Sequence, residues 1–298
     1  MIKKILKKMY LSSLKVIGNK GLGKMPILKQ LNKKILKSIK SDFAVVNGFK
    51  MYLDKQDCSG LSVGTGYEKV ETQVMKDNIK KGDIVIDCGA NIGYYTLLFS
   101  ELVGKSGKVF AFEPDPANFS LLQKNLKVNN VNNVVALNLA VSDKNGEDIL
   151  FLDKNNVGHN RMYSEGDKDK DKIKINCVKL DDYFKNFKRE INLIKLDIEG
   201  AEGKAIKGSL NLIKKNKDIK LILEFFPFAL KSCGTEPGEL LTILRKKGFN
   251  VEEINEGTSE LTPTNESILL DKKHFIELGH VATNLLFTRE LNKIYSAT

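Results

Sequence analysis

Cysteines, histidines and long apolar runs are scarce in this chain of 298 residues. No two of the four cysteines have the Cys-x-x-Cys spacing of zinc sites and redox motifs, and nothing suggests a disulfide scaffold. We therefore expect a reducing, cytoplasmic environment, with Cys88 and Cys177 as apolar core thiols. No stretch approaches 18 consecutive apolar residues, and the N-terminus lacks an uninterrupted apolar segment. The sequence thus predicts neither a transmembrane helix nor a signal peptide.

Acidic side chains are absent from residues 1–40, which contain twelve lysines. The whole chain has 48 basic and 37 acidic side chains, so residues 41–298 have 36 basic against 37 acidic ones. The net charge of +11 therefore belongs to an N-terminal arm. A groove for nucleic acid would need such charge clustered on one face of the body, so we expect no nucleic-acid partner.

The arm, residues 1–40, has apolar residues at helical spacing, followed by a separate domain at residues 41–298. The apolar residues are Ile27, Leu28, Leu31, Ile35 and Ile39. They predict an amphipathic helix with lysines on its other faces. Three interpretations stay open: packing on the domain or on a partner chain, peripheral anchoring at the anionic inner membrane surface, and an arm for nucleic acid. The sequence does not indicate the oligomeric state.

Alternating strands and helices dominate the sequence after residue 80. A hairpin is predicted at 43–57 with Gly48 at its turn, then a loop at 60–66 and a helix at 68–80. Predicted parallel strands follow at 84–87, 109–113, 134–139, 193–197 and 219–225, with helices at 94–103, 116–128, 181–187, 201–216 and 237–247. Further extended segments are predicted at 148–152, 173–180, 249–254 and 281–288. This alternation predicts an α/β fold whose sheet is covered on both faces.

The strongest local motif is the run from Asp87 to Gly93, which joins a strand to a helix. Gly89 and Gly93 let the backbone approach a ligand closely, and the helix start directs N–H groups at it. The spacing Asp-x-Gly-x-x-x-Gly lacks the extra glycine of the dinucleotide motif, which makes room for a pyrophosphate. The loop therefore favours a ligand without a pyrophosphate.

Acidic residues follow several of the predicted strands. Glu113 ends the strand after the glycine loop, where an acid can bind both ribose hydroxyls of a nucleoside. Ser142 and Asp143 follow the next strand, where an adenine edge would meet polar groups. Asp197, Glu199 and Glu202 surround Gly200 after the fourth parallel strand, and Glu224 ends the fifth. Either Glu199 or Glu202 could instead cap the following helix.

These elements in this order resemble the FkbM family of methyltransferases over about residues 50–255. The matching segments are Gly66–Glu68, Val85–Thr96, Val109–Pro116, Leu139–Asp143, Leu180–Tyr183, Leu193–Glu202 and Leu223–Glu224. The resemblance implies a Rossmann-like class I methyltransferase fold with a mixed seven-stranded sheet. It also implies S-adenosylmethionine as methyl donor and a hydroxyl acceptor on a sugar, glycan or other small natural product. The donor-binding residues it implies are Glu68, Asp87, Gly89, Ala90, Asn91, Gly93, Glu113, Pro114, Ser142, Asp143 and Asp197.

Transfer of a methyl group to a hydroxyl needs alignment of donor and acceptor and a base for the hydroxyl proton. The candidate catalytic residues are Asp197, Glu199 and His159, the last in a polar loop with Asn160 and Arg161. No histidine lies near the acids after the fourth strand, so we expect no catalytic metal.

Three other functions stay open at this stage. An NAD-linked oxidoreductase is disfavoured by the missing third glycine. Methylation of nitrogen on a macromolecule is disfavoured because the sequence has no Asn/Asp-Pro-Pro-Tyr-like motif. A non-catalytic module that binds S-adenosylmethionine would have the same pocket without turnover.

Overall fold

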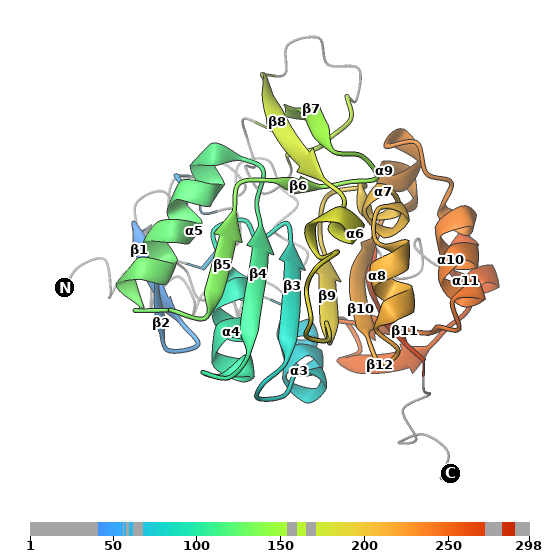
Figure 1. Cartoon of the computed structure of the whole chain (residues 1–298), viewed down its shortest axis with the longest axis horizontal. Coiled ribbons are helices and arrows are strands. Elements are labelled where there is room, and N and C mark those ends of the chain that lie inside the picture. The colour runs from blue at the N-terminus through green and yellow to red at the C-terminus, as the bar shows by residue number, and fades with distance from the viewer. Residues whose placement is uncertain are drawn as a thin grey trace, which may run out of the picture. The chain divides into compact units, whose positions relative to one another are not determined.

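The computed structural model in Figure 1 describes residues 41–55, 57, 60–61, 68–153, 160–164, 171–271 and 282–289. The chain forms two compact units, Met1–Tyr67 and Glu68–Thr298. The basic arm, residues 1–40, lies outside the described residues, so its helices and its boundary at residue 40 remain predictions.

The described part of the first unit is a β-hairpin, as predicted. Strands β1 (Phe43–Val46) and β2 (Phe49–Tyr52) pair antiparallel around Asn47 and Gly48. Both turn residues have positive φ, 48° and 83°, which is the geometry of a tight two-residue hairpin turn.

The second unit contains an eight-stranded mixed sheet in the order β12–β11–β13–β10–β9–β3–β4–β5. Its strands are β3 (Ile84–Cys88), β4 (Lys108–Phe112), β5 (Val134–Leu137), β9 (Leu193–Leu196), β10 (Lys220–Phe225), β11 (Asn250–Asn255), β12 (Glu260–Pro263) and β13 (Thr283–Thr288). The five strands from β10 to β5 are parallel, and β13 runs antiparallel between β10 and β11. The expected Rossmann-like fold with a mixed sheet is confirmed. The edge strand β12 adds an eighth strand to the expected seven.

Helices cover both faces of this sheet, with α3 and α4 behind it and α6, α8 and α10 in front (Figure 1). The helices are α3 (Lys69–Asn78), α4 (Tyr94–Val103), α5 (Pro116–Val128), α6 (Leu180–Tyr183), α7 (Glu202–Lys207), α8 (Leu210–Lys215), α9 (Pro227–Ser232), α10 (Pro237–Lys246) and α11 (Glu266–Leu270). The start of α5 is the predicted one, because Asp115 accepts a hydrogen bond from the Ala117 N–H at 2.8 Å and Pro116 fits the first turn.

The single helix predicted at 201–216 is wrong, because α7 and α8 are separate helices. The carbonyl of Gly208 accepts a hydrogen bond from the Asp181 N–H at 3.0 Å instead of continuing the helix. A β-carbon on Gly208 would also lie 2.0 Å from the Ser142 carbonyl oxygen. Close packing at one glycine therefore breaks the predicted helix.

A second, three-stranded sheet lies between β5 and β9 in the chain, above the carboxyl ends of the main strands (Figure 1). It consists of β6 (Ala140–Val141), β7 (Gly146–Phe151) and β8 (Lys172–Val178) in the order β6–β8–β7. Phe151 also pairs with Arg161 in an isolated bridge. The small sheet therefore positions residues 160–164.

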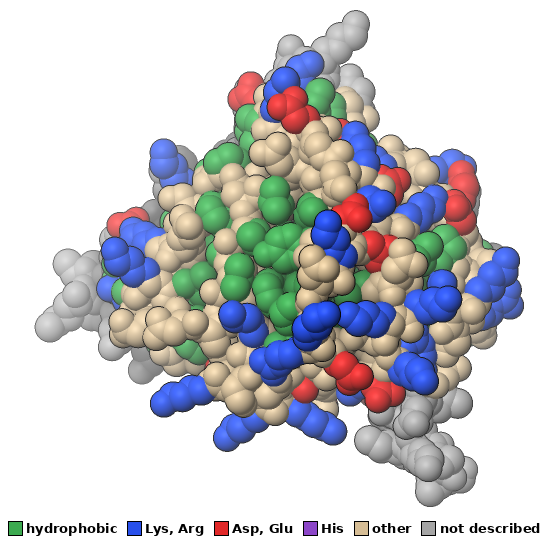
Figure 2. Space-filling view, in the orientation of Figure 1, with side chains coloured by type: hydrophobic (Ala, Val, Ile, Leu, Met, Phe, Trp, Pro, Cys, Tyr) green, Lys and Arg blue, Asp and Glu red, His purple; other side chains and the backbone are tan. Residues whose placement is uncertain are grey.

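The main core fills the space between the sheet and the front helices. Phe110 makes edge-to-face contacts with Tyr183, Phe184 and Phe187 at centroid distances of 4.9–6.2 Å. Figure 2, in the orientation of Figure 1, shows apolar side chains at the centre of the front face and lysine or arginine side chains along its lower edge. Cys88 and Cys177 are buried free thiols, as expected. Within the described ranges, no helix has both the length and the apolar character to span a bilayer.

Candidate functional site

The glycine loop after β3 lies between the ends of two neighbouring strands. Gly89 has a φ of 82°, and a β-carbon on it would lie 1.9 Å from the Asp197 carbonyl oxygen at the end of β9. The N–H groups of Gly89 and Ala90 donate to the Phe112 carbonyl oxygen on β4 at 2.9 and 3.0 Å. Gly93, with a φ of 96°, begins α4. The loop thus occupies the carboxyl edge where open α/β sheets bind ligands.

Glu113 follows β4 and faces this loop. It is 5% exposed, and its two carboxylate oxygens accept hydrogen bonds from the N–H groups of Asn91, at 2.7 Å, and Asp115, at 2.9 Å. Burial raises the pKa of Glu113 to about 8, although these two N–H groups lower it. The side chain of Asn138 donates to the carbonyl oxygens of Glu113 and Pro114, which fixes the turn. Each oxygen of the carboxylate keeps acceptor capacity for a further donor.

Residues 160–164 are tied to the same turn. Asn160 donates through its side-chain amide to Asp115 at 2.7 Å, beside Glu113. At the other end of this short segment, Tyr163 is buried against Ala201 and Ala229. The segment therefore connects the Glu113 turn with the loop after β9.

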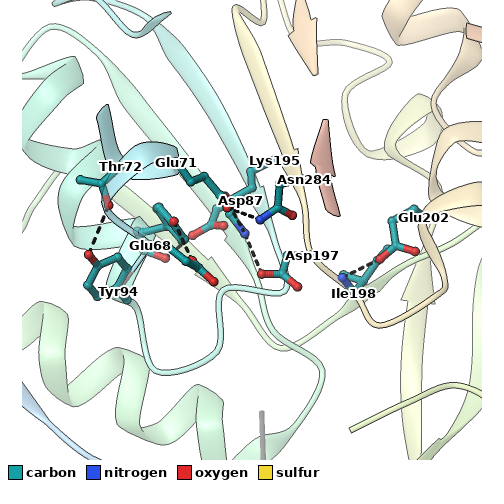
Figure 3. Close-up of polar contacts among 12 residues, drawn as sticks. Glu68, Glu71, Thr72, Asp87, Tyr94, Lys195, Asp197, Ile198, Glu202 and Asn284 are labelled. Carbon is teal, nitrogen blue, oxygen red and sulfur yellow. Dashed lines mark hydrogen bonds and ion pairs between the residues drawn. The ribbon is translucent and has the colours of Figure 1, made fainter. Parts of the chain in front are cut away.

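A row of polar side chains crosses the back face of the sheet under α3 and α4 (Figure 3). Asp87 and Lys195 are register partners on β3 and β9, so their side chains share that face. Lys195 is 3% exposed, and its Nζ lies 2.8 Å from Asp197 Oδ2 and 3.8 Å from Glu71 Oε1. The other Glu71 oxygen accepts a hydrogen bond from Asn284 on β13 at 2.5 Å. One buried lysine thus lies among carboxyl groups from three elements.

Burial shifts the acids in this row strongly. It raises the pKa of Glu71 to about 8, against the attraction of Lys195. Burial also raises the pKa of Asp87 to about 6, although Lys195 and a 2.5 Å hydrogen bond from the Thr96 hydroxyl lower it. Burial alone would lower the pKa of Lys195, but Asp197, Glu71 and Asp87 raise it well above its ordinary value. Lys195 therefore stays charged.

Glu68 joins this row through the aromatic residues at the start of α4. It caps α3 with a left-handed φ of 39° and accepts a hydrogen bond from the Tyr95 hydroxyl at 2.7 Å. The ammonium group of Lys195 lies 4.5 Å from the centroid of the Tyr95 ring. Glu68 is therefore in the same cluster as Asp87 and Asp197.

Glu199 is close enough to Asp197 for the two carboxyl groups to repel each other. Its φ of 54° is left-handed, a conformation that a non-glycine residue seldom adopts and that is frequent at functional sites. Arg161 Nε lies 3.4 Å from Glu199 Oε2, and both side chains are about 15% exposed. Burial, and then repulsion from Asp197, raises the pKa of Glu199 to about 8, although Arg161 lowers it. The Glu199 carboxylate is thus a stronger base than an ordinary glutamate carboxylate.

Glu202 and Glu224 complete the acidic group after β9 and β10. Glu202 Oε1 accepts hydrogen bonds from the N–H groups of Ile198 and Gly200 at 2.9 and 3.3 Å, so it closes the turn before α7. The N-cap residue of α7 is Ala201, which makes no side-chain capping bond. Burial raises the pKa of Glu224 well above its ordinary value, and Asp197 and Glu199 add to this. Among the described residues, no three potential ligand side chains are grouped as a metal site.

Ser142 follows β6 of the small sheet. It is fully buried, its N–H donates to the Val178 carbonyl oxygen at 3.0 Å, and its hydroxyl lies 3.3 Å from Asp143 Oδ1. Asp143 is exposed. Their suggested place beside an adenine stays a prediction.

The structure therefore brings most of the predicted residues together in two groups. The glycine loop, Asn91, Glu113 and Pro114 form one group, and Glu68, Asp87 and Asp197 form the other. Glu199 borders the second group. His159 lies outside the described residues, so its candidate role remains a prediction.

Sequence reasoning missed Lys195, Glu71 and Asn284. Lys195 had a recognisable signal, because it interrupts the apolar strand Leu193–Leu196 and a buried lysine needs an acidic partner. Glu71 and Asn284 are distant in the sequence and carried no such signal.

Comparison with known proteins places this site in a family. The family described as "Methyltransferase FkbM domain" matches residues 87–251, which are more than half of the chain and include most of the site. The chain belongs to the FkbM methyltransferase family. The sequence motifs suggested the same family. Membership supports S-adenosylmethionine as the methyl donor of this chain.

Individual relatives of this FkbM methyltransferase are distant. It is 28% identical to "Methyltransferase 1" of Beauveria bassiana over 42% of this chain and 57% of that protein. It is 25% identical to "Methyltransferase sdnD" of Sordaria araneosa over 70% of this chain and 88% of that protein. The structure titled methyltransferase FkbM from Methylobacillus flagellatus is 18% identical and covers 70% of this chain and 44% of that one, with a TM-score of 0.41. These matches do not identify an acceptor.

Proposed function

We propose that this protein transfers a methyl group from S-adenosylmethionine to a hydroxyl oxygen of a sugar, a glycan or another small natural product. The observation that carries the proposal is the Glu113 carboxylate, held by two backbone N–H groups opposite the glycine loop. Two ribose hydroxyls can donate to its remaining acceptor positions. The residues present therefore fit a nucleoside-bearing donor.

The second group of site residues suits the charged end of the same donor. The loop from Asp87 to Gly93 would hold the methionine part, with Glu68 and Asp197 as carboxyl groups for its positive charges. When bound, S-adenosylmethionine supplies a methyl group on a sulfonium, which is already activated for displacement. The chain's own task is then to align the acceptor and to take up its proton.

Glu199 is the described residue best placed to take up that proton. Its raised pKa, near 8, makes it a stronger base than an ordinary glutamate, and Arg161 fixes its position. Asp197 already accepts a hydrogen bond from Lys195, and Glu202 already accepts hydrogen bonds from the N–H groups of Ile198 and Gly200. The near-neutral charge of residues 41–298 favours a small or glycan acceptor over a nucleic acid.

The direct test combines donor binding with methyl incorporation. Calorimetry of the purified chain with S-adenosylmethionine and with S-adenosylhomocysteine should show binding of both compounds. Donor labelled in its methyl group should then transfer label to a member of a panel of sugars, glycans and glycolipids, and Glu199→Gln should slow that transfer without weakening donor binding.

Each other result points to a different function. Label in a protein or an RNA, and in no hydroxyl compound, would indicate N-methylation of a macromolecule. Donor binding without transfer to any acceptor class would indicate a non-catalytic module. No binding of either compound would contradict the proposal altogether.

A further inference from the structure

Lys195 approaches Asp197 from the buried side of the sheet. The lysine side chain is 3% exposed and the aspartate side chain is 36% exposed, and the two are joined by a hydrogen bond of 2.8 Å to Oδ2. No described residue donates a hydrogen bond to the other oxygen, Oδ1. Lys195 therefore occupies Oδ2 and leaves Oδ1 available as a hydrogen-bond acceptor.

Asp197 lies among acidic side chains. Carboxyl groups from α3, β3, β10 and the loop after β9 interact with it or with its lysine partner: Glu68, Glu71, Asp87, Glu199, Glu202 and Glu224. Positive charge comes from Lys195 and, beyond Glu199, from Arg161. Neighbouring negative charges repel a carboxylate, and an ion pair counteracts this repulsion. Among the described residues, Lys195 is the cation that contacts Asp197.

We propose that Lys195 is a positioning residue for the methyl donor: its ion pair fixes Asp197 through Oδ2, so that Oδ1 can bind a cationic group of the donor. This inference rests on the proposed function, since it takes S-adenosylmethionine as the ligand. The sulfonium and the ammonium group of that compound are its two positive charges. Lys195 itself need not touch the donor.

Calorimetric titration of the full chain with two compounds, S-adenosylmethionine and 5′-methylthioadenosine, tests the proposal. The second compound keeps the nucleoside and its sulfur but has neither the sulfonium nor the ammonium group. Lys195→Met removes the charge and keeps the shape. If the lysine positions Asp197 for a cationic group, the ratio of the variant's Kd to the wild-type Kd should be on the order of tenfold for S-adenosylmethionine and near one for 5′-methylthioadenosine.

Lys220→Met is the matched control. Lys220 is a half-buried lysine of the same sheet, on β10, and its Nζ binds Asn78 of α3 at 2.9 Å. It therefore also links the sheet to α3, but it contacts no carboxylate of the site. Its Kd ratio should stay near one for both compounds.

Asp197→Asn gives a second test if Lys195→Met does not fold, because Asp197 is partly exposed. The variant lacks the carboxylate that the lysine holds. If Asp197 binds a cationic group of the donor, this variant should bind S-adenosylmethionine more weakly by about the same factor, on the order of tenfold, and should bind 5′-methylthioadenosine as the wild type does.

The outcomes separate this inference from the proposed function. A Lys195→Met ratio of similar size for both compounds would show a merely structural role and overturn the inference. So would wild-type affinity for S-adenosylmethionine in Asp197→Asn. If the wild-type chain does not bind S-adenosylmethionine at all, the proposed function itself fails.

Discussion

The Asp197 carbonyl oxygen lies only 1.9 Å from the position that a β-carbon on Gly89 would occupy, which is too close for two non-bonded atoms. The Asp197 N–H donates to the Cys88 carbonyl oxygen at 3.1 Å, so the two strand ends are held at this short separation. The loop that would bind the donor and the acid beside it are therefore packed backbone against backbone. The site requires glycine here for reasons of space as well as of φ.

Gly89→Ala should destabilise the protein by about 3 kcal/mol or more, because strand β9 must move to admit the methyl group. Gly146→Ala is the matched control. Gly146 also has a positive φ, 113°, but a β-carbon there would meet no atom within 4 Å. That control should cost only about 1–2 kcal/mol, the backbone term. Urea unfolding of both variants measures the difference, and equal losses would contradict the close approach.

Glu113→Ala should weaken binding of S-adenosylmethionine by about 1–3 kcal/mol, the usual contribution of hydrogen bonds to a charged group. Glu147→Ala, at an exposed position of β7, is the control and should bind as the wild type does. Isothermal titration calorimetry compares them. An unchanged affinity in the Glu113 variant would exclude the ribose role.

Local features of the site could be read from the sequence. The bounds of α4 were predicted correctly, since the glycine turn and the apolar run that define it are adjacent in the chain. The cap of α5 by Asp115 was also predictable, because it needs only the next two residues. The position of Glu113 at the end of its strand was also predictable, because the strand and the turn that follows it are adjacent in the sequence.

Features that depend on tertiary packing could not be predicted in this way. The break between α7 and α8 comes from contact of Gly208 with Ser142, and a window of sequence reports only the helical period on each side. The partners of Lys195 come from α3 and from the end of its own strand. The hydrogen bond that the Asn160 side chain donates to Asp115 joins two separate loops. Each of these contacts exists only once the sheet is assembled.

Stability should fall as the pH rises through the titration of Glu199. Its pKa is raised from 4.5 to about 8, so the folded protein keeps this proton to higher pH than the unfolded chain does. The associated stability is complete below about pH 4.5 and is lost as the pH rises through about 8. Glu199→Gln cannot ionise, so it should match the wild type near pH 5 and exceed it by about 1–2 kcal/mol near pH 9. Chemical denaturation at both pH values measures this.

The control for that experiment is Glu147→Gln. Glu147 is 64% exposed on β7, so its substitution should leave the pH dependence of stability as in the wild type. If Glu199→Gln loses stability with pH as steeply as the wild type does, other buried acids carry the effect.

The basic arm allows a separate prediction, based on its twelve lysines and lack of acids. If it anchors the protein peripherally, vesicles containing anionic phospholipid should bind the full chain, and neutral vesicles should not. Deletion of residues 1–40 should abolish the binding while calorimetry shows unchanged donor affinity. Full-length protein that stays in the supernatant with anionic vesicles would remove the membrane interpretation and leave protein packing or a nucleic-acid arm.

Donor binding should release a proton from Glu113. Burial raises its pKa to about 8 in the free protein, so a large fraction of the carboxyl groups is protonated near neutral pH. Ribose hydroxyls that donate to the carboxylate stabilise its ionised form and lower the pKa in the complex. Calorimetry near pH 7 in buffers with different ionisation enthalpies should therefore report a net release of up to about one proton per donor bound. Glu113→Gln should abolish most of that release, and proton uptake by the wild type would show that the hydroxyls do not bind Glu113 as donors.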